Sequence, residues 1–596
     1  MSTHRATILL GLLLPASGFA AIAPVALPVE RMLSADAEPR PVPNAVFAPG
    51  PDALQAPAFT GTLTIGASPL LAQPELSTPV LEGRDARVFP GITLSFVSDG
   101  STLVPVERGE MVRETAPGAV ASYWRVIPQF GRVWRQPADG GWSRAAFPLM
   151  LVNDTENHAH QGLATFVYQD TQVSRLRVQF VQQTAPYLQS PHCVLWGSAP
   201  MAFARLDATR ASTERTAGMA ELSTRLPSRP LADLRQRLPP GTLDGFGGPV
   251  LPKWQVARGL VFDGTLYYEA EPTSYGDYPY PLEMRFGVRS VMKAVAAPLS
   301  LLRLAEVYGP EVINLKIGDY VPGLDPKWQR VRFIDAANMA TGFGGTGTLG
   351  TRPNNFFDGY LDADYDGWYT APTSAGKLAH INAHLKPYPW EPGTVLRYRD
   401  QDFHLLGIAI DAYLKSKRGP QADAWDMLRH EVFEPIGIHQ APTVRTREAG
   451  RHDGPAWFSA GYYPTLDDLA KIALLYADIG AHDGKQILHR DLTQDLLAGR
   501  GALDKLSDNS RPRAQDAPPP QYYKMGFHFT VFTGARSGRT VLLPTMSGFG
   551  DNEVILFPGR IVAIRAANVA NVPPGEKALS DDVDATLRAV DRLAPF

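Results

Sequence analysis

Cysteine is nearly absent from this chain of 596 residues, which contains one, Cys193. A single cysteine excludes an internal disulfide and any zinc site built from cysteines, and we expect it to be a small buried apolar side chain. An excess of positive charge is also lacking, because the formal net charge is −3 and no basic stripe occurs. Nucleic acid is therefore not an expected partner.

Long apolar runs are missing beyond the first residues. Residues 1–23 have the pattern of a signal peptide, in which His4-Arg5 precedes a short apolar run from Ala6 to Leu14 and then small residues. That run is too short to span a bilayer comfortably, and no other segment approaches about 18 uninterrupted apolar residues. We expect an exported protein, periplasmic or secreted, with no transmembrane segment.

Several motifs of other enzyme classes are absent. The chain has no His-Glu-x-x-His and no Gly-x-Ser-x-Gly, which argues against a zinc protease of that type and against an α/β-hydrolase. Residues 345–350 match the dinucleotide fingerprint in form, but they neither follow an apolar strand nor open a helix. We therefore expect no cofactor.

Metal-binding patterns are weak. Asp362, Asp364 and Asp366 match the start of a calcium loop, but the twelfth position is Thr373 instead of the usual glutamate. A solvated turn is the preferred interpretation, and calcium is the alternative. His158 and His160 are two residues apart without a third ligand signal, so no metal is expected there.

Composition divides the chain into five segments. We predict a signal peptide at 1–23, a leader rich in proline and alanine at 24–57, a β-rich accessory domain at 58–207, a linker at 208–252 and a catalytic domain at 253–596. Short alternating runs with turn signals between them predict an all-β fold for the accessory domain, and a sandwich is one arrangement that fits.

The last segment mixes strands and helices. Hairpins are predicted at 259–268 and 553–565, and helices at 290–307, 402–415 and 466–478, with a final helix over 580–593. Strands at both ends with helices between them predict an α+β domain, in which the terminal segments complete one antiparallel sheet. The aromatic residues Trp390, Tyr275, Tyr278 and Tyr280 are candidates for an apolar substrate surface or for simple packing.

The most informative stretch is Ser290-Val-Met-Lys293. The serine and the lysine are one helical turn apart, so both side chains lie on one helix face. Serine is a weak nucleophile and needs a neighbouring base, which Lys293 together with Tyr398 could supply. Burial would lower the pKa of Lys293 towards a form that can take the proton. A second copy, Ser374-Ala-Gly-Lys377, has no strand-like run before it and is disfavoured.

Four motifs in order carry a family resemblance. They are Ser290-Val-Met-Lys293, the run from Pro392 to Tyr398-Arg-Asp400, Phe458-Ser-Ala-Gly461 and Met546-Ser-Gly-Phe-Gly550. Over residues 254–596 the chain resembles the serine β-lactamase and penicillin-binding-protein superfamily, and more closely its β-lactamase-related esterases, D-peptidases and amide hydrolases. The resemblance implies a β-lactamase-like antiparallel sheet with a helical insert.

The resemblance also implies roles for single residues. Ser290 is the nucleophile, Lys293 its activator and Tyr398 the proton shuttle, while the backbone amides of Ser290 and Phe549 form an oxyanion hole. The implied substrate-binding positions are Asp400, Met546, Ser547 and Gly548.

Two of these positions depart from the family pattern. Asp400 stands where the family usually has asparagine, and its charge would raise the pKa of Lys293. Met546 stands where lysine or histidine commonly grips a substrate carboxylate. An ester or amide without an obligatory carboxylate is therefore the expected substrate, small or peptide-like. The alternatives are a penicillin-recognising D-peptidase or β-lactamase, and a non-catalytic relative that binds a peptide or glycan.

Overall fold

The computed structural model describes residues 26–76, 79–81, 83–115, 121–184, 192–248, 254–344, 360, 364–448, 454–505, 521–569 and 584–596. The predicted signal peptide at 1–23, the glycine-rich run at 345–350, Asp362 and the predicted start of the last helix at 580 lie outside these ranges. Among the helices in the described ranges, none is both long and apolar enough to cross a membrane.

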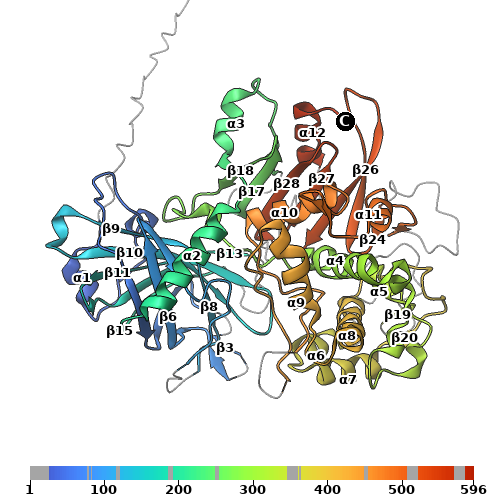
Figure 1. Ribbon diagram of the computed structural model, residues 1–596, viewed down its shortest axis with the longest axis horizontal. Coiled ribbons are helices and arrows are strands. Elements are labelled where there is room, and N and C mark those ends of the chain that lie inside the picture. The colour runs from blue at the N-terminus through green and yellow to red at the C-terminus, as the bar shows by residue number, and fades with distance from the viewer. Residues whose placement is uncertain are drawn as a thin grey trace, which may run out of the picture.

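The first half of the chain forms one curled antiparallel sheet (Figure 1), with thirteen strands within the described residues. The strands are β1 Thr60–Ile65, β2 Ser68–Gln73, β5 Val88–Phe89, β6 Ile92–Asp99, β7 Thr102–Pro105, β8 Arg125–Pro128, β9 Gly131–Arg135, β10 Ser143–Val152, β11 Ala159–Gln169, β12 Gln172–Val173, β13 Leu176–Thr184, β14 Val194–Ala199 and β15 Met201–Ala204. Their order is β15-β1-β6-β7-β9-β10-β11-β13-β14-β2-β5, with β8 and β12 paired beside β10 and β11. Hydrogen bonds thus join all of them into one sheet, which differs from the two stacked sheets of a sandwich.

Apolar side chains fill the inside of this curled sheet. Leu94, Phe96, Phe147 and Phe180 are completely buried there together, as the alternation of apolar residues along the strands predicts. Cys193 lies in the same core, as expected from its lack of a partner. The helix α2 (Ala208–Ser223) covers β6 and β7 from the other side.

The second half contains a nine-stranded sheet within the described residues. Its strands are β16 Ser228–Pro230, β17 Gln255–Phe262, β18 Thr265–Ala270, β23 Leu503–Asp504, β24 Tyr522–Lys524, β25 Phe527–Thr533, β26 Thr540–Gly548, β27 Asn552–Phe557 and β28 Ile561–Ala567. The order is β16-β18-β17-β28-β27-β26-β25-β24-β23. Both predicted hairpins are confirmed, and β17 pairs with β28, so segments from the two ends of this half share one sheet.

Helices cover both faces of this sheet. Leu260 of β17 faces a core with α3 (Leu231–Arg237) and α12 (Asp584–Leu593), while the next residue, Val261, faces the core of α4 (Val291–Tyr308) and α10 (Leu466–Ala477). Figure 1 shows α3 and α12 on one side and α4, α5 and α8 on the other. The remaining helices are α1 Val29–Leu33, α5 Phe333–Ala337, α6 Tyr365–Thr370, α7 Ser374–His384, α8 Asp400–Arg418, α9 Ala424–Leu428 and α11 Arg490–Leu497. The short strand pairs are β3 Val80–Leu81 with β4 Arg84–Asp85, β19 Phe343–Gly344 with β20 Lys386–Pro387, and β21 Ala481–His482 with β22 Lys485–Gln486. The helices predicted at 290–307, 402–415 and 466–478 correspond to α4, α8 and α10.

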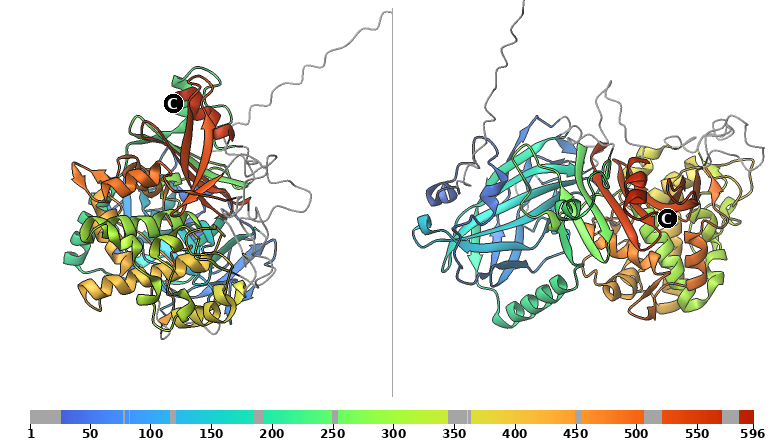
Figure 2. Two further views of the ribbon diagram at one scale, coloured as in Figure 1. Left: turned by 90° about the vertical axis from the view of Figure 1, so that its right-hand side faces the viewer. Right: turned by 90° about the horizontal axis from the view of Figure 1, so that it is seen from above.

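The two halves lie side by side and are bonded to each other (Figure 2). Asn44 accepts a hydrogen bond from Gln179 of β13 and donates to Thr273 in the second half, both at 2.9 Å. The Tyr278 hydroxyl donates to the carbonyl of Gly162 at 2.8 Å, and the Tyr280 hydroxyl to that of Phe47 at 2.7 Å. These two tyrosines therefore pack between the halves, and the packing interpretation is the correct one for them.

Candidate active site

Ser290 stands at the start of α4, directly after a strained backbone turn. Arg289 has a φ of 50°, which a residue with a Cβ rarely adopts. The Arg289 amide is held there by the side-chain oxygen of Asn157 at 2.7 Å. Gly548, at the end of β26, packs against the same turn, and a Cβ on it would clash with the carbonyl oxygen of Val288. The turn and the end of β26 thus fix the position of Ser290.

The three predicted catalytic side chains meet in the structure. Lys293 Nζ lies 2.7 Å from Ser290 Oγ, and Tyr398 Oη lies 2.6 Å from the same oxygen. Lys293 also donates to the carbonyl of Ser459 at 3.1 Å, in the predicted Phe458–Gly461 segment. Lys293 is 1% exposed and Tyr398 6% exposed. The hydroxyl of the serine is therefore in contact with two groups that can exchange a proton with it.

Asp400 changes the charge state expected for the lysine. Its Oδ1 lies 2.5 Å from Lys293 Nζ. Burial by itself lowers the pKa of Lys293, but the Asp400 carboxylate and Tyr398 more than offset it, so the pKa is raised above its ordinary value. The expected lowering by burial is thus present, but the raising effect predicted for Asp400 prevails. Burial also raises the pKa of Tyr398, against the opposing effect of Lys293.

Two further tyrosines bind the other oxygen of Asp400. Tyr360 and Tyr365 donate to Oδ2 at 2.8 and 2.6 Å. Burial and the nearby carboxylate raise the pKa of both hydroxyls well above the ordinary value, so both stay protonated donors. Sequence reasoning missed these tyrosines, because nothing in their spacing from Asp400 indicates the contact.

A cavity of about 240 Å³ opens beside Ser290. Its lining residues are Arg289, Ser290, Tyr360, Tyr365, Tyr369, Asp400, Ala460 and Phe549. Aromatic faces dominate the wall, and Phe549 is 46% exposed. Ser290 and Phe549, whose backbone amides are the predicted oxyanion hole, border the same space. The role of those amides stays a prediction.

Not all of the third motif reaches this cavity. Met546 is completely buried in the hydrophobic core, and Ser547 pairs with Glu553 across β26 and β27. Neither residue lines the cavity, whereas Asp400 does. Gly548 acts through its missing side chain, since it lets β26 approach the turn before Ser290. Trp390 is also outside the cavity lining and stacks against the guanidinium of Arg397.

A loop of the β domain supports the nucleophile turn. Asn153 accepts hydrogen bonds from the amides of Thr155 and Glu156 at 2.9 and 2.8 Å, which folds the loop between β10 and β11. Glu156 Oε2 then lies 3.1 Å from Arg289 Nη2, and Asn157 holds the Arg289 amide. The other nitrogen, Nη1, donates to the Tyr369 hydroxyl at 3.1 Å. The β domain is therefore part of the support of the site.

The second Ser-x-x-Lys copy has another role. Lys377 is buried and donates to the carbonyls of Trp368 and Tyr369 at 2.9 and 2.7 Å, so it caps the end of α6. The hydroxyl of Ser374 contacts that of Thr446 at 3.1 Å. Lys377 therefore binds backbone carbonyls and not the hydroxyl of Ser374, which agrees with the expectation that Ser374 is not the nucleophile.

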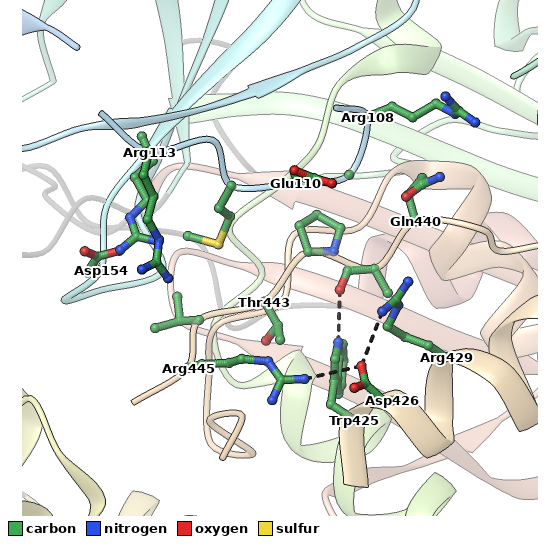
Figure 3. A pocket seen from close by; sticks show the side chains of 16 residues that line it. Arg108, Glu110, Arg113, Asp154, Trp425, Asp426, Arg429, Gln440, Thr443 and Arg445 are labelled. Atoms are coloured by element: carbon green, nitrogen blue, oxygen red, sulfur yellow. Dashed lines mark hydrogen bonds and ion pairs between the residues drawn. The ribbon is translucent and has the colours of Figure 1, made fainter. Parts of the chain in front are cut away.

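A further cavity of about 340 Å³ lies between the two halves (Figure 3). Arginines from both sides border it, among them Arg108, Arg429 and Arg445. Each of the three is paired with a carboxylate, at 3.0, 3.2 and 2.7 Å respectively. Among the described residues that line this space there is neither a serine nor a lysine, the groups that meet beside the Ser290 cavity.

Comparisons with known proteins give likeness only at the level of structure. No family model and no curated protein matches the sequence. Among solved structures, the chain is similar to a penicillin-binding protein homologue from Caulobacter crescentus, at 15% identity and a TM-score of 0.35, over 57% of this chain and 92% of the other. It is also similar to a family VIII carboxylesterase, at 13% identity, a TM-score of 0.37 and coverage of 57% and 92%. A class C β-lactamase matches at 14% identity, a TM-score of 0.33 and coverage of 64% and 97%. What this chain does has to be argued from its own site.

Proposed function

We propose that this chain is a serine hydrolase that cleaves an ester or amide through an acyl-enzyme on Ser290. The observation that carries the proposal is the placement of Ser290 Oγ, 2.7 Å from Lys293 Nζ and 2.6 Å from Tyr398 Oη, at the wall of a cavity. A serine in contact with a buried lysine and a buried tyrosine has what nucleophilic catalysis requires, namely a nucleophile and a route for its proton.

The proton passes through the Lys293–Asp400 pair. Asp400 Oδ1 lies 2.5 Å from Lys293 Nζ, and once a proton of Lys293 has moved to Oδ1 the nitrogen has a free electron pair. That nitrogen takes the proton of Ser290 as Oγ attacks the carbonyl carbon, and the carbonyl oxygen becomes negative. The negative oxygen then re-forms the carbonyl as the bond from carbon to the leaving group breaks; Tyr398 gives its proton to the leaving group and is reprotonated by Lys293. In the second half of the reaction, water attacks the acyl carbon and gives up a proton to the same groups, and Ser290 Oγ leaves with a proton, which releases the acid.

The aromatic wall favours a small or peptide-like substrate with an apolar acyl or leaving group. Tyr360, Tyr365, Tyr369 and Phe549 offer ring faces, and charged groups are few. The proposal includes export of the protein, which stays a prediction from residues 1–23.

Covalent labelling tests the proposal. The full chain is treated with a fluorophosphonate, and the labelled peptide is identified by mass spectrometry. We expect the label on Ser290, and Ser290→Ala should lower ester hydrolysis by at least about 10³-fold with little change in thermal stability.

The control is Ser374→Ala, in the second Ser-x-x-Lys copy, which should label and hydrolyse like the parent protein. Label on another serine, or a Ser290→Ala protein that retains most activity, would refute the proposal. Absence of both label and hydrolysis in the folded parent protein would instead support the non-catalytic alternative.

A further inference from the structure

Two histidines and one aspartate meet away from Ser290, between α6 and α7. Asp364 directly precedes α6, and His380 and His384 lie one turn apart on the same face of α7. Asp364 Oδ2 is 2.6 Å from His380 Nδ1 and 3.5 Å from His384 Nε2. One ligand atom from each of the three residues lies within 4.8 Å of the other two.

The 3.5 Å between Asp364 Oδ2 and His384 Nε2 matches the spacing of ligand atoms around a bound metal ion, whereas the 2.6 Å to His380 Nδ1 is a hydrogen-bond distance. A tetrahedral zinc ion with bonds of about 2.0–2.2 Å holds its ligand atoms roughly 3.3–3.5 Å apart. Because both histidines project from one helix, small side-chain rotations bring the three atoms to that spacing. A donor set of two imidazoles and one carboxylate suits zinc, cobalt or nickel, whereas calcium and magnesium prefer oxygen ligands.

The backbone before α6 turns Asp364 towards α7. Asp364 has a φ of 57° and a ψ of 48°, the left-handed conformation that costs a non-glycine residue energy. Gly367 leaves room for the carboxylate, since a Cβ there would clash with Asp364 Oδ2. Two of the three aspartates of the alternative calcium interpretation lie in the described ranges, where Asp364 joins two histidines and Asp366 is exposed on α6.

A surface hydrogen bond between histidine and aspartate is the simpler alternative. On another part of the surface, His482 and Asp483 lie side by side with 3.5 Å between Nε2 and Oδ2, as a histidine–aspartate pair without a third ligand. In the described part of the chain, only one histidine–aspartate pair has a third candidate ligand beside it, namely the group of Asp364, His380 and His384. The convergence of three donors from two elements separates this cluster from an ordinary pair.

We propose that Asp364, His380 and His384 bind one divalent transition-metal ion of the zinc type, with water in the remaining position. The ion fastens the start of α6 to α7. α6 carries Tyr365, which binds Asp400, and Tyr369, which binds Arg289, and both tyrosines line the cavity beside Ser290. The metal therefore stiffens one wall of the cavity without touching the nucleophile.

Metal titration of the untagged full chain, first stripped with a chelator, tests this. Zn²⁺ is followed by calorimetry and Co²⁺ by its visible absorption, which reports tetrahedral coordination by nitrogen and oxygen. We expect one ion per chain and a higher Tm with Zn²⁺. His380→Ala, His384→Ala and Asp364→Asn should each weaken binding by at least about 100-fold, because losing even a group that only supports a ligand costs about 10- to 100-fold.

His482→Ala is the matched control and should bind Zn²⁺ like the parent protein. Each variant is compared with the parent protein without metal, so that a folding defect shows as a lower Tm before any ion is added. The proposal is overturned if the parent chain binds neither Zn²⁺ nor Co²⁺ at metal concentrations of about 0.1 mM. It is also overturned if the three variants bind as tightly as the parent protein, or if Ca²⁺ is the only ion that binds.

Discussion

Lys293 Nζ and Asp400 Oδ1 are 2.5 Å apart in a buried position behind Ser290. The carboxylate raises the pKa of the lysine despite its burial, and two tyrosine hydroxyls donate hydrogen bonds to the carboxylate. A charged lysine has no free electron pair for the proton of serine. Asp400 thus decides how the proposed base works.

Asp400→Asn tests whether the carboxylate takes the lysine proton. Without Asp400, burial is the main influence on Lys293 and its pKa falls below that in the parent protein. If Asp400 accepts the proton of Lys293, the parent protein does not need Lys293 to lose that proton to solvent, whereas the variant works only above the pKa of Lys293. We therefore expect the acidic limb of kcat/KM to move to higher pH in Asp400→Asn, measured with p-nitrophenyl acetate. A move to lower pH would mean that Asp400 only suppresses Lys293.

Lys293→Arg tests whether a removable proton is needed. Guanidinium keeps its charge but does not give up a proton at working pH. We expect kcat/KM to fall on the order of 10²–10⁴-fold, the range of general-base catalysis. The rate of fluorophosphonate labelling should fall in parallel, while the thermal transition shows whether the fold is intact. An active arginine variant would show that the group acts by charge alone.

Asn157→Ala tests the support from the β domain. The variant loses the acceptor of the buried Arg289 amide, next to Ser290. An unsatisfied buried donor costs about 1–3 kcal/mol of stability, and misplacement of the nucleophile lowers kcat by up to about 10²-fold. Both effects are measured by thermal unfolding and by steady-state kinetics. Gln172→Ala, at an exposed position of strand β12 in the same domain, should change neither. A folded Asn157→Ala protein with full activity would restrict the β domain to a role apart from catalysis.

The cavity predicts a preference for uncharged substrates. Met546 is buried away from the cavity, and Arg397 and Arg399 are buried with a backbone carbonyl as partner. Arg289 does line the cavity, but it is paired with Glu156. A charge-assisted hydrogen bond to a substrate carboxylate contributes about 1.5–3 kcal/mol, and the one cation among the described lining residues, Arg289, is already paired.

We therefore expect kcat/KM for p-nitrophenyl acetate or butyrate to exceed that for nitrocefin and a D-Ala-D-Ala peptide. The opposite order would favour the penicillin-recognising alternative. Arg289 would then be the cation to test, because it alone of these arginines borders the cavity.

The sequence by itself determined the local chemistry. A serine and a lysine three residues apart at the start of a helix share one face whatever surrounds them, and the hairpins and long helices follow from their apolar spacing. Tyr398, 108 residues from Ser290, was found because the ordered motifs resemble a known family. His380 and His384 are four residues apart and so lie on one helix face, but they are not among the residues singled out from the sequence, and a solvated turn is the preferred interpretation there for the stretch that holds Asp364.

Only the tertiary structure decided the charge and the surroundings of the site. The pKa of Lys293 depends on its distance from Asp400 and on its burial, and both come from the packing of α4 against α8. Tyr360, Tyr365, Glu156 and Asn157 reach the site from segments whose own patterns carry no sign of it. Helix geometry sets contacts between residues three or four apart, whereas contacts across a hundred residues depend on how every element packs.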